Sequence, residues 1–410
     1  MIAQHLRPVV TDSREAGMSI KARNARLVLV TLLFFICLAL GSQENSIDWL
    51  EISEDVLESW STEISADRPS VMRVSPKWRQ RDSDIPKRIV GIVPKKSSSY
   101  SLAATELLRV LHDRGIYADL SIINFANDIQ RGLEILEAAE TEQTDLIFSM
   151  GSESADLVHR YYSGDRIPVV TCTNKDPVML GQIGDYESGS GNNIAYTSLN
   201  VPLDIQKNYL FRLKPDLVNI GLLYNRNHVQ VMATEVIPAQ KIFRGIGMHV
   251  VDIAVDSTET ARQELRERLP EAVVEMKKTD PDLSKSVFWV TSSTAVFSNM
   301  DIVSEYCEPV PVLSSIPNAV TEGEDSAVLA IGIDRRNNAH LAAIYAVTIL
   351  KGEAQPGELP VGVVTPPDVA INFRIARKIQ LKIPFSFVES AAFIYDYDGK
   401  LARAFGEIVK

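Results

Sequence analysis

Short apolar runs alternate with amphipathic stretches along most of this 410-residue chain. In the first series, four apolar runs predict buried strands at 88–94, 118–125, 145–151 and 167–173. The amphipathic stretches between them predict helices at 102–113, 129–141 and 154–162. Strands and helices that alternate through short connections form a parallel, doubly wound sheet. The first half of the chain is therefore predicted to be an α/β lobe.

The same unit occurs a second time. It has predicted strands at 218–225, 248–255, 286–292 and 310–316, and predicted helices at 204–213, 231–243, 258–277 and 299–306. Two such halves predict an α/β fold of two Rossmann-like lobes with parallel sheets and a cleft between them. A further strand, helix and strand at 327–364 would return the chain to the first lobe, which requires three hinge crossovers. We therefore assign 87–195 plus 334–366 to lobe 1, 196–333 plus 367–395 to lobe 2, and 396–410 to a C-terminal tail.

The N-terminus differs from the rest of the chain. Residues 27–40 carry no charge, three basic residues precede them, and Gly41 follows. This pattern is typical of a signal peptide, predicted here as 1–41. A spacer with one short helix, whose apolar spacing runs over 49–64, is predicted for 42–86. We expect an exported, periplasmic or otherwise extracytoplasmic protein, with anchoring by an uncleaved signal as the alternative.

Charge and motifs exclude several classes of function. The formal charge is −11, and the loss of 1–41 removes five basic and two acidic side chains and leaves −14. Such an acidic chain is not suited to bind nucleic acid. The sequence has no Gly-x-Ser-x-Gly elbow, no phosphate-binding glycine loop, no metal-ligand spacing of histidines and no Cys-x-x-Cys. We therefore expect no enzyme activity, no cofactor and no metal. Whether Cys172 and Cys307 pair is left open.

Hydroxyl and amide side chains follow the predicted strands, at the edge where ligands bind in open α/β sheets. Helix N-termini at these places would favour an anionic or zwitterionic small molecule. For any single residue, simple capping of the helix is an equal alternative. The predicted ligand-binding residues are Ser97, Ser98, Ser152, Thr173, Asp176, Ser198, Asn225 and Ser292.

Several short motifs, taken in order, resemble a known family. They include Asp145-Leu146-Ile147, Gly151-Ser152, Asp176-Pro177, Gly191-Asn192-Asn193-Ile194, Tyr224-Asn225, Ile331-Gly332-Ile333-Asp334 and Leu350-Lys351-Gly352-Glu353. From about 88 to 392 the chain resembles the substrate-binding proteins of ABC transporters that include tryptophan- and tyrosine-type amino-acid receptors. The resemblance implies the type I periplasmic-binding fold, an amino acid or other carboxylate-bearing ligand, and an ABC permease in the inner membrane as partner.

The sequence departs from the family pattern at the expected cleft and hinge. Tyr196 lies in the first crossover where the family continues differently, Arg226 replaces a usual proline, and Asp334 is followed by Arg335-Arg336 instead of the usual tyrosine. Tyr196, Arg226 and Asp334 are therefore predicted as ligand or hinge residues. Arg226 in the cleft would favour a carboxylate, and an exposed surface arginine is the alternative. A second function, a periplasmic sensing subunit that signals to a membrane kinase or receptor through 42–86, also remains open.

Overall fold

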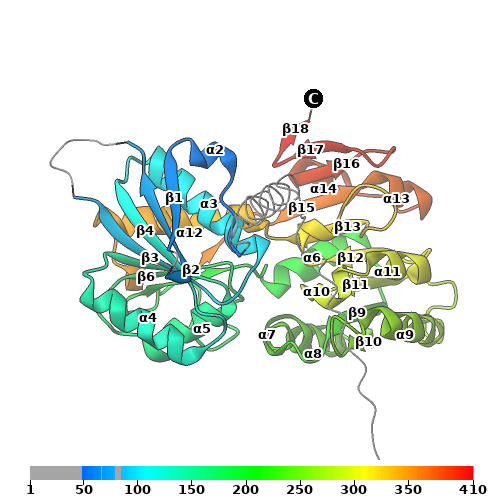
Figure 1. The fold of residues 1–410 in the computed structure, drawn as a ribbon. Helices are drawn as coiled ribbons and strands as arrows, with labels where there is room; N and C mark the ends of the chain where they lie inside the picture. The colour runs from blue at the N-terminus through cyan, green and yellow to red at the C-terminus, as the bar shows by residue number, and fades with distance from the viewer. Residues whose placement is uncertain (1–48, 66, 79–84, 410) are drawn as a thin grey trace, which may run out of the picture. The chain divides into compact units, whose positions relative to one another are not determined.

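The structure is a computed structural model that describes residues 49–65, 67–78 and 85–409. The predicted signal peptide, 1–41, lies outside the described residues. Within the described residues, no helix is long and apolar enough to cross a membrane. Their strands form a seven-stranded, a nine-stranded and a two-stranded sheet. We call the seven-stranded sheet with its helices lobe 1, and the nine-stranded sheet with its helices lobe 2 (Figure 1).

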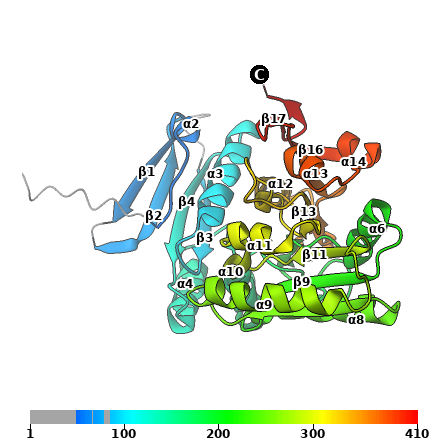
Figure 2. The same ribbon diagram turned by 90° about the vertical axis from the view of Figure 1, so that its right-hand side faces the viewer.

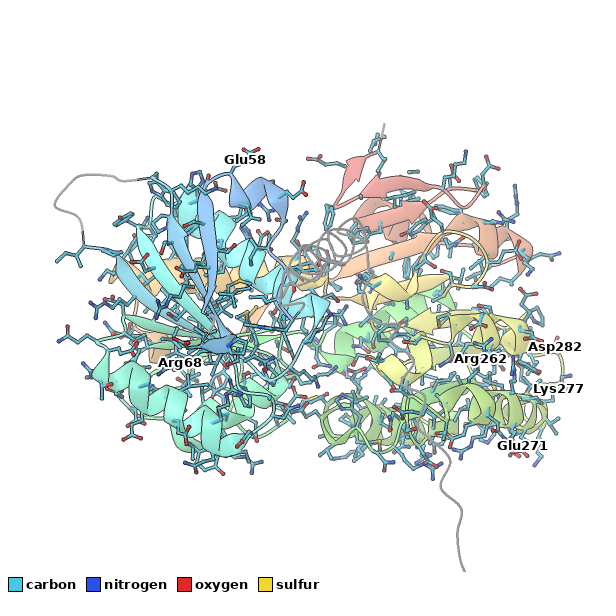
Figure 3. The ribbon with its side chains drawn as sticks, in the orientation of Figure 1. Glu58, Arg68, Arg262, Glu271, Lys277 and Asp282 are labelled. Atoms are coloured by element: carbon cyan, nitrogen blue, oxygen red, sulfur yellow. The ribbon has the colours of Figure 1, made fainter. Side chains whose placement is uncertain are left out.

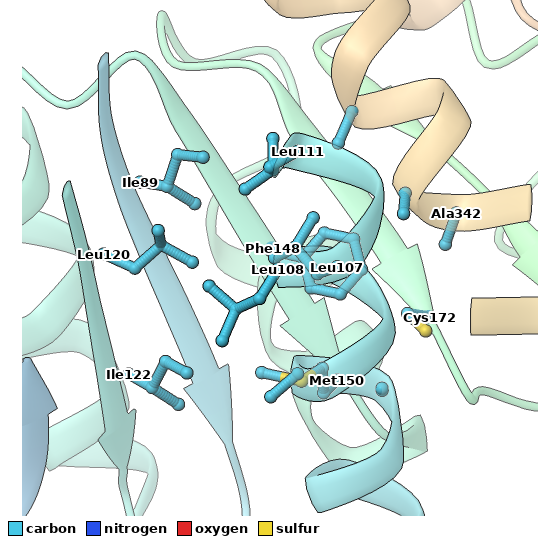
Figure 4. Packing of buried hydrophobic residues seen from close by; sticks show 14 of the residues in the cluster. Ile89, Leu107, Leu108, Leu111, Leu120, Ile122, Phe148, Met150, Cys172 and Ala342 are labelled. Atoms are coloured by element: carbon cyan, nitrogen blue, oxygen red, sulfur yellow. The ribbon is translucent and has the colours of Figure 1, made fainter. Parts of the chain in front are cut away.

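Lobe 1 is built on a parallel sheet of the order β4-β3-β5-β6-β7. Its strands are β3 (Lys87–Val93), β4 (Ala118–Asn124), β5 (Leu146–Met150), β6 (Val169–Cys172) and β7 (Ile194–Ala195). The covering helices are α3 (Ser98–Asp113), α4 (Ile129–Thr141), α5 (Ser152–Tyr161) and α12 (Arg335–Leu350). One face of the sheet packs against α3 and α12, where Leu107, Leu111 and Ala342 meet Ile89 and other strand residues (Figure 4). The opposite face packs against α4 and α5 through residues such as Leu136 and Leu157.

The described part of 42–86 is not a spacer, which corrects the prediction for this segment. It contains a short helix α2 (Glu54–Leu57) and two strands, β1 (Trp60–Ser65) and β2 (Arg68–Pro76). These strands form an antiparallel hairpin, and β2 pairs with β4, which extends the sheet of lobe 1 (Figure 2). A short helix was predicted from the apolar spacing over 49–64, and α2 is one, but residues from Trp60 onward form β1, and β2 joins the hairpin to the sheet through a distant strand. Met72, for example, lies opposite Ile122.

Lobe 2 has a parallel sheet of the order β10-β9-β11-β12-β13. These strands are β9 (Asn219–Asn225), β10 (His249–Val255), β11 (Ser286–Val290), β12 (Val312–Ser314) and β13 (Leu329–Gly332). The helices on one face are α9 (Ala261–Met276), α10 (Thr294–Phe297) and α11 (Met300–Cys307). The other face is covered by α6 (Leu203–Leu213), the π-helix η1 (Met232–Val236) with α7 (Val229–Val231) and α8 (Ile237–Gly245), and α13 (Phe373–Lys378) and α14 (Phe385–Ser390).

Helix α9 has one apolar face that packs on the sheet and one charged face that does not. Leu265, Leu269 and Met276 are buried against lobe 2, whereas Arg262 and Glu271 are exposed. Figure 3 labels Arg262 and Glu271 of this helix, of which Arg262 pairs with Asp301 of α11. This division of one helix into an apolar and a charged face is the periodicity from which the helix was predicted.

The C-terminal residues also belong to lobe 2, which corrects the predicted tail at 396–410. Strand β13 pairs with β15 (Asp368–Asn372), followed by β16 (Ala391–Tyr395), β17 (Leu401–Ala404) and β18 (Glu407–Ile408). The last two strands pair antiparallel and extend the sheet. Their short length and mixed composition gave no clear strand pattern, and packing of Phe405 against Phe393 fixes the hairpin.

The chain passes between the lobes three times, and the three passages contact one another. After β7, the strand β8 (Thr197–Ser198) pairs with β14 (Gly362–Val363), which precedes the last passage. In the second passage, the backbone N–H of Asp334 donates to Asp368 Oδ2 at 2.7 Å. These contacts tie the three passages into one hinge. The predicted α/β fold of two lobes joined by three crossovers is confirmed.

The two described cysteines do not pair. Cys172 lies in the core of lobe 1 and Cys307 in the core of lobe 2, and both are free and buried. Burial raises the pKa of each thiol, so both remain protonated at neutral pH. Both thiols therefore act as apolar packing groups.

Candidate functional site

A cavity of about 160 Å³ lies between the two lobes, where the carboxyl ends of their parallel strands meet. Lobe 1 lines it with residues from the starts of α3, α5 and α12 and from the loop after β6. Lobe 2 lines it with residues from α6, from the π-helix η1 and from the loops after β9, β11 and β12. Ligands in open α/β sheets bind at this end of the strands. The place of the cavity therefore follows from the fold.

The lobe 1 wall contains the N-termini of three helices. Ser97 caps α3 by accepting a hydrogen bond from the Ser99 N–H, Ser152 is the first residue of α5, and Arg335 is the first residue of α12. Each of the three residues lines the cavity. Backbone N–H groups and the helix dipole favour negative charge at such ends.

Gly151 allows Tyr100 to reach this wall. Gly151 precedes α5 and has a φ of 99°, a conformation that side-chain-bearing residues rarely adopt. A Cβ atom at this position would lie 2.4 Å from Tyr100 Oη, so only glycine leaves space for the phenol. Burial, and then the nearby Glu153 carboxylate, raise the pKa of Tyr100, although Arg335 opposes this rise. The phenol therefore keeps its proton at neutral pH and can donate a hydrogen bond into the cavity.

An ion pair connects the two lobes across the cavity. Lys175 Nζ of lobe 1 lies 2.8 Å from Glu235 Oε1 of η1, and these side chains are only 13% and 6% exposed. Ser292 donates to Glu235 through its hydroxyl and through its backbone N–H, the latter at 2.9 Å. Ser315 and Asn200 donate to the same carboxylate at 3.0 and 3.2 Å. Glu235 is therefore fully hydrogen-bonded inside the protein.

Two opposing effects act on the pKa of Glu235. Burial alone raises it, but the Lys175 charge and the hydrogen bonds from Lys175 and Ser292 together outweigh burial and lower it. Glu235 is therefore ionised at neutral pH, and its negative charge is matched by Lys175.

A wider cleft of about 660 Å³ adjoins the cavity, with which it shares Lys95, Glu153, His228 and Gln230. Lys95 and Glu153 form an ion pair of 2.7 Å at this mouth and are 52% and 38% exposed. Burial, and then the charge of Lys175, lower the pKa of His228, so its ring is neutral at pH 7. A ligand in the inner cavity can therefore extend outward past polar groups.

Of the eight residues predicted to bind ligand, the structure brings four together in the cavity. These four are Ser97, Ser152, Thr173 and Ser292. Ser98 is an exposed neighbour of Ser97 on α3, and Asn225 lies in the outer cleft and accepts a hydrogen bond from the Asn227 N–H. Direct contact of these residues with a ligand remains a prediction.

Asp176 and Ser198 lie near the hinge, away from the cavity lining. Asp176 is buried, and its carboxylate accepts hydrogen bonds from the Val178 and Met179 N–H groups and from Tyr186. Ser198 donates weakly to the same carboxylate at 3.5 Å. Asp176 lies in the loop after β6 and Ser198 ends β8, so the polar groups of both residues bond the loop and the crossover themselves.

The three residues predicted as ligand or hinge residues differ in their roles. Tyr196 is buried in the first crossover and hydrogen-bonds His159 at 2.9 Å, and Asp334 caps α12 through the Arg336 N–H. Arg226 does not point into the cavity, because it forms an ion pair of 2.8 Å with Asp256, half-exposed on lobe 2. Arg226 is therefore not placed to bind a ligand carboxylate in the cavity, as had been expected.

Seven charged or aromatic residues of the cavity lining were not predicted as site residues: Lys95, Tyr100, Glu153, Lys175, His228, Glu235 and Arg335. A signal existed for Arg335, since it stands directly after Asp334 where the family pattern has tyrosine. No sequence signal pointed to Glu235. It lies within a helical segment and reaches the cavity from a π-helical turn, which hydrophobic periodicity does not predict.

A family model described as ABC transporter substrate binding protein matches residues 99–393. A search of curated proteins finds no match. Among solved structures, a ligand-free, open substrate-binding protein with adhesive properties from Clostridium difficile is 21% identical, with a TM-score of 0.56 over 75% of this chain and 98% of that one.

Two further structures have similar values. A conserved domain protein from Vibrio cholerae is 18% identical, with a TM-score of 0.57 over 76% of this chain and all of that one. A Streptococcus pneumoniae ABC domain in complex with L-Trp is 20% identical, with a TM-score of 0.55 over 75% of this chain and all of that one. At these identities the similarities show the fold, which is the type I periplasmic-binding fold.

Proposed function

Because this chain belongs to the family of ABC transporter substrate-binding proteins, we propose that it is an extracytoplasmic receptor for a small solute. It captures the solute between its lobes and delivers it to an ABC permease in the membrane. The observation that carries this proposal is the cavity of about 160 Å³ that both lobes line with polar groups. A cavity of about 150 Å³ holds a molecule the size of benzene, so the solute is small.

The cavity supports binding through directed polar contacts. Hydroxyl groups, amides and helix N-termini of lobe 1 face serines and Gln206 of lobe 2. A solute that contacts both walls favours the arrangement in which the lobes are close together, which is how hinged binding proteins close on their ligands. A permease can then distinguish the ligand-bound receptor from the empty one.

The solute class follows from the wall chemistry and from the relatives. Three helix N-termini on the lobe 1 wall favour an anionic group. The Streptococcus relative was solved in complex with L-Trp. We therefore propose an amino acid or another carboxylate-bearing solute.

Calorimetric titration tests the proposal with a panel of amino acids, short peptides, carboxylates and sugars. We expect micromolar binding of at least one member, which corresponds to about 8 kcal/mol of binding free energy. Absence of binding by a folded, ligand-stripped sample to every member would contradict the receptor function.

Two neighbouring serines provide a matched pair of variants for the same titration. Ser99 lines the cavity, whereas Ser98 is exposed outside it. Ser99→Trp fills the cavity and is expected to abolish binding, and Ser98→Trp is expected to leave binding unchanged. Equal binding by both variants would place the ligand elsewhere.

A further inference from the structure

Arg335 is the one cavity-lining arginine or lysine among the described residues that forms no salt bridge. Its guanidinium forms no hydrogen bond or salt bridge with any residue that the structure describes, although it is partly buried. The charge of the neighbouring Asp334 acts on Arg335, but the Asp334 carboxylate lies outside the cavity lining, accepts the Arg336 N–H and forms no salt bridge with the Arg335 guanidinium. A desolvated arginine without a partner is costly. An anionic ligand bound in the cavity would therefore offset the cost of burying this guanidinium.

The two carboxylates that line the cavity, Glu153 and Glu235, are already engaged. Glu235 accepts hydrogen bonds from Lys175, Ser292, Ser315 and Asn200. Glu153 pairs with Lys95 at the outer mouth. With these two ion pairs matched and His228 neutral, the lining residues carry one uncompensated positive charge, that of Arg335.

Two neutral groups of the lobe 1 wall also have no hydrogen-bond partner among the described residues. Thr173 lines the cavity and is only 6% exposed. Its buried hydroxyl has no hydrogen-bond partner in the part of the chain that the structure describes. The phenol of Tyr100 likewise makes no hydrogen bond to a described residue, and it lies close enough to Arg335 for the two groups to affect each other's titration. The lobe 1 wall thus combines one cation with two hydroxyl groups, beside three helix N-termini.

We infer that the cavity selects a small organic monocarboxylate without an ammonium group, whose carboxylate binds Arg335 together with Tyr100. This inference rests on the proposed receptor function and names its ligand class. A carboxylate matches the fork of the guanidinium and forms strong charge-assisted hydrogen bonds.

Other anionic ligands fit the wall less well. A zwitterionic amino acid would bring an ammonium group into a cavity whose carboxylates are already engaged, so it would lose hydration without gaining an ionic partner. A phosphate monoester carries close to two negative charges at pH 7, of which the Arg335 side chain compensates one, so the partial charges of the helix N-termini would have to compensate the other. The monocarboxylate is the ligand whose single charge the Arg335 side chain balances.

Pairs of compounds that differ only in the ammonium group test this inference by calorimetry. The probes are L-leucine with isocaproate, L-phenylalanine with hydrocinnamate, and L-alanine with propionate. We expect at least one carboxylate to bind about 10-fold or more tightly than its amino acid. Tighter binding of the amino acid in every pair would overturn the inference, but it would leave the receptor function supported.

Variants of two adjacent arginines complete the test. Arg335→Gln is expected to weaken binding of the carboxylate about 10- to 100-fold, the loss typical of a charge-assisted hydrogen bond, and Arg335→Lys is expected to restore part of it. Arg336 does not line the cavity and stacks on Phe405, so Arg336→Gln is the matched control and should bind normally. Thermal unfolding checks that each variant is folded.

Two outcomes separate the inference from the function on which it rests. Unchanged carboxylate binding by a folded Arg335→Gln variant would overturn the inference alone. No binding of any probe or sugar by the wild-type protein would contradict the receptor function and the inference together.

Discussion

At the scale of single residues, charge pairing decides what the cavity can accept. Lys175 and Glu235 come from different lobes and satisfy each other, with serine and asparagine groups completing the carboxylate's hydrogen bonds. Buried ion pairs add little net stability over apolar packing, but the loss of one partner is costly because the other charge remains. The ion pair therefore joins the lobe 1 wall to the lobe 2 wall. Arg335 is then the lining cation that remains available to a ligand.

The pair makes a prediction about stability and pH. Glu235→Gln leaves Lys175 without its counter-charge, and we expect a loss of about 2–4 kcal/mol in the free energy of unfolding at pH 7. Because the pKa of Glu235 is lowered in the folded protein, this contribution is fully present above the unfolded pKa near 4.5. It is lost as the pH falls through the lower folded pKa.

Urea unfolding of the wild type and of Glu235→Gln between pH 7 and 3 measures this effect. The difference should be constant down to about pH 5 and shrink at lower pH. Glu275→Gln is the matched control, because Glu275 pairs with Lys278 on the surface and both side chains are exposed. Its unfolding free energy should stay close to that of the wild type, and an equal loss in both variants would show that the interlobe pair has no special role.

Gly151 provides a second prediction at the residue scale. Gly151→Ala places a methyl group against the Tyr100 ring in a backbone conformation that alanine rarely adopts, and we expect a loss of about 2–4 kcal/mol together with weaker ligand binding. Gly164 has a similar φ of 90° but open space around it. Gly164→Ala therefore isolates the backbone strain, and denaturant titration of both variants should show the larger loss for Gly151→Ala.

At the scale of elements, the N-terminal hairpin is part of the lobe 1 core. Trp60 is fully buried, donates from its indole N–H to the Leu108 carbonyl at 3.2 Å, and packs edge-on against Trp78. The hairpin lies outside the stretch that matches the family model. The hairpin therefore contributes to the packing of this lobe through Trp60.

Truncation of Trp60 tests this role. Trp60→Ala is expected to cost about 3–5 kcal/mol, as for other fully buried aromatic residues. Trp49 is the control, because its side chain is only partly buried and bonds the Pro69 carbonyl at 3.0 Å, so Trp49→Ala should cost clearly less. Equal costs, measured by denaturant unfolding, would contradict the view that β1 is anchored by Trp60.

The parallel core and the hinge could be predicted from the sequence because local patterns determine them. Runs such as 88–94 and 145–151 are apolar throughout, as strands buried on both faces must be. The N-terminal hairpin and the C-terminal strands β17 and β18 were not predicted, since their strands are of mixed composition and the attachment of β2 to β4 depends on a distant strand. Residue patterns located the strand ends of the cavity, but the partners that engage Asp176 and Arg226 are visible only in the fold.

At the scale of the whole binding unit, the hinge connects the passages that a closing motion must bend. Asn338, at the start of α12, accepts the Thr173 N–H at 2.8 Å and donates to the Ser198 carbonyl at 3.2 Å. Thr173 also lines the cavity. Asn338 therefore links a residue of the cavity wall to the first crossover.

The most direct test of the account is a crystal structure of the complex with the tightest ligand of the calorimetric panel. We predict that the ligand lies in the interlobe cavity, with its carboxylate at Arg335 and Tyr100 of lobe 1 and its remainder against Gln206 or Ser292 of lobe 2. A ligand bound to one lobe alone, or outside this cavity, would contradict capture between the lobes.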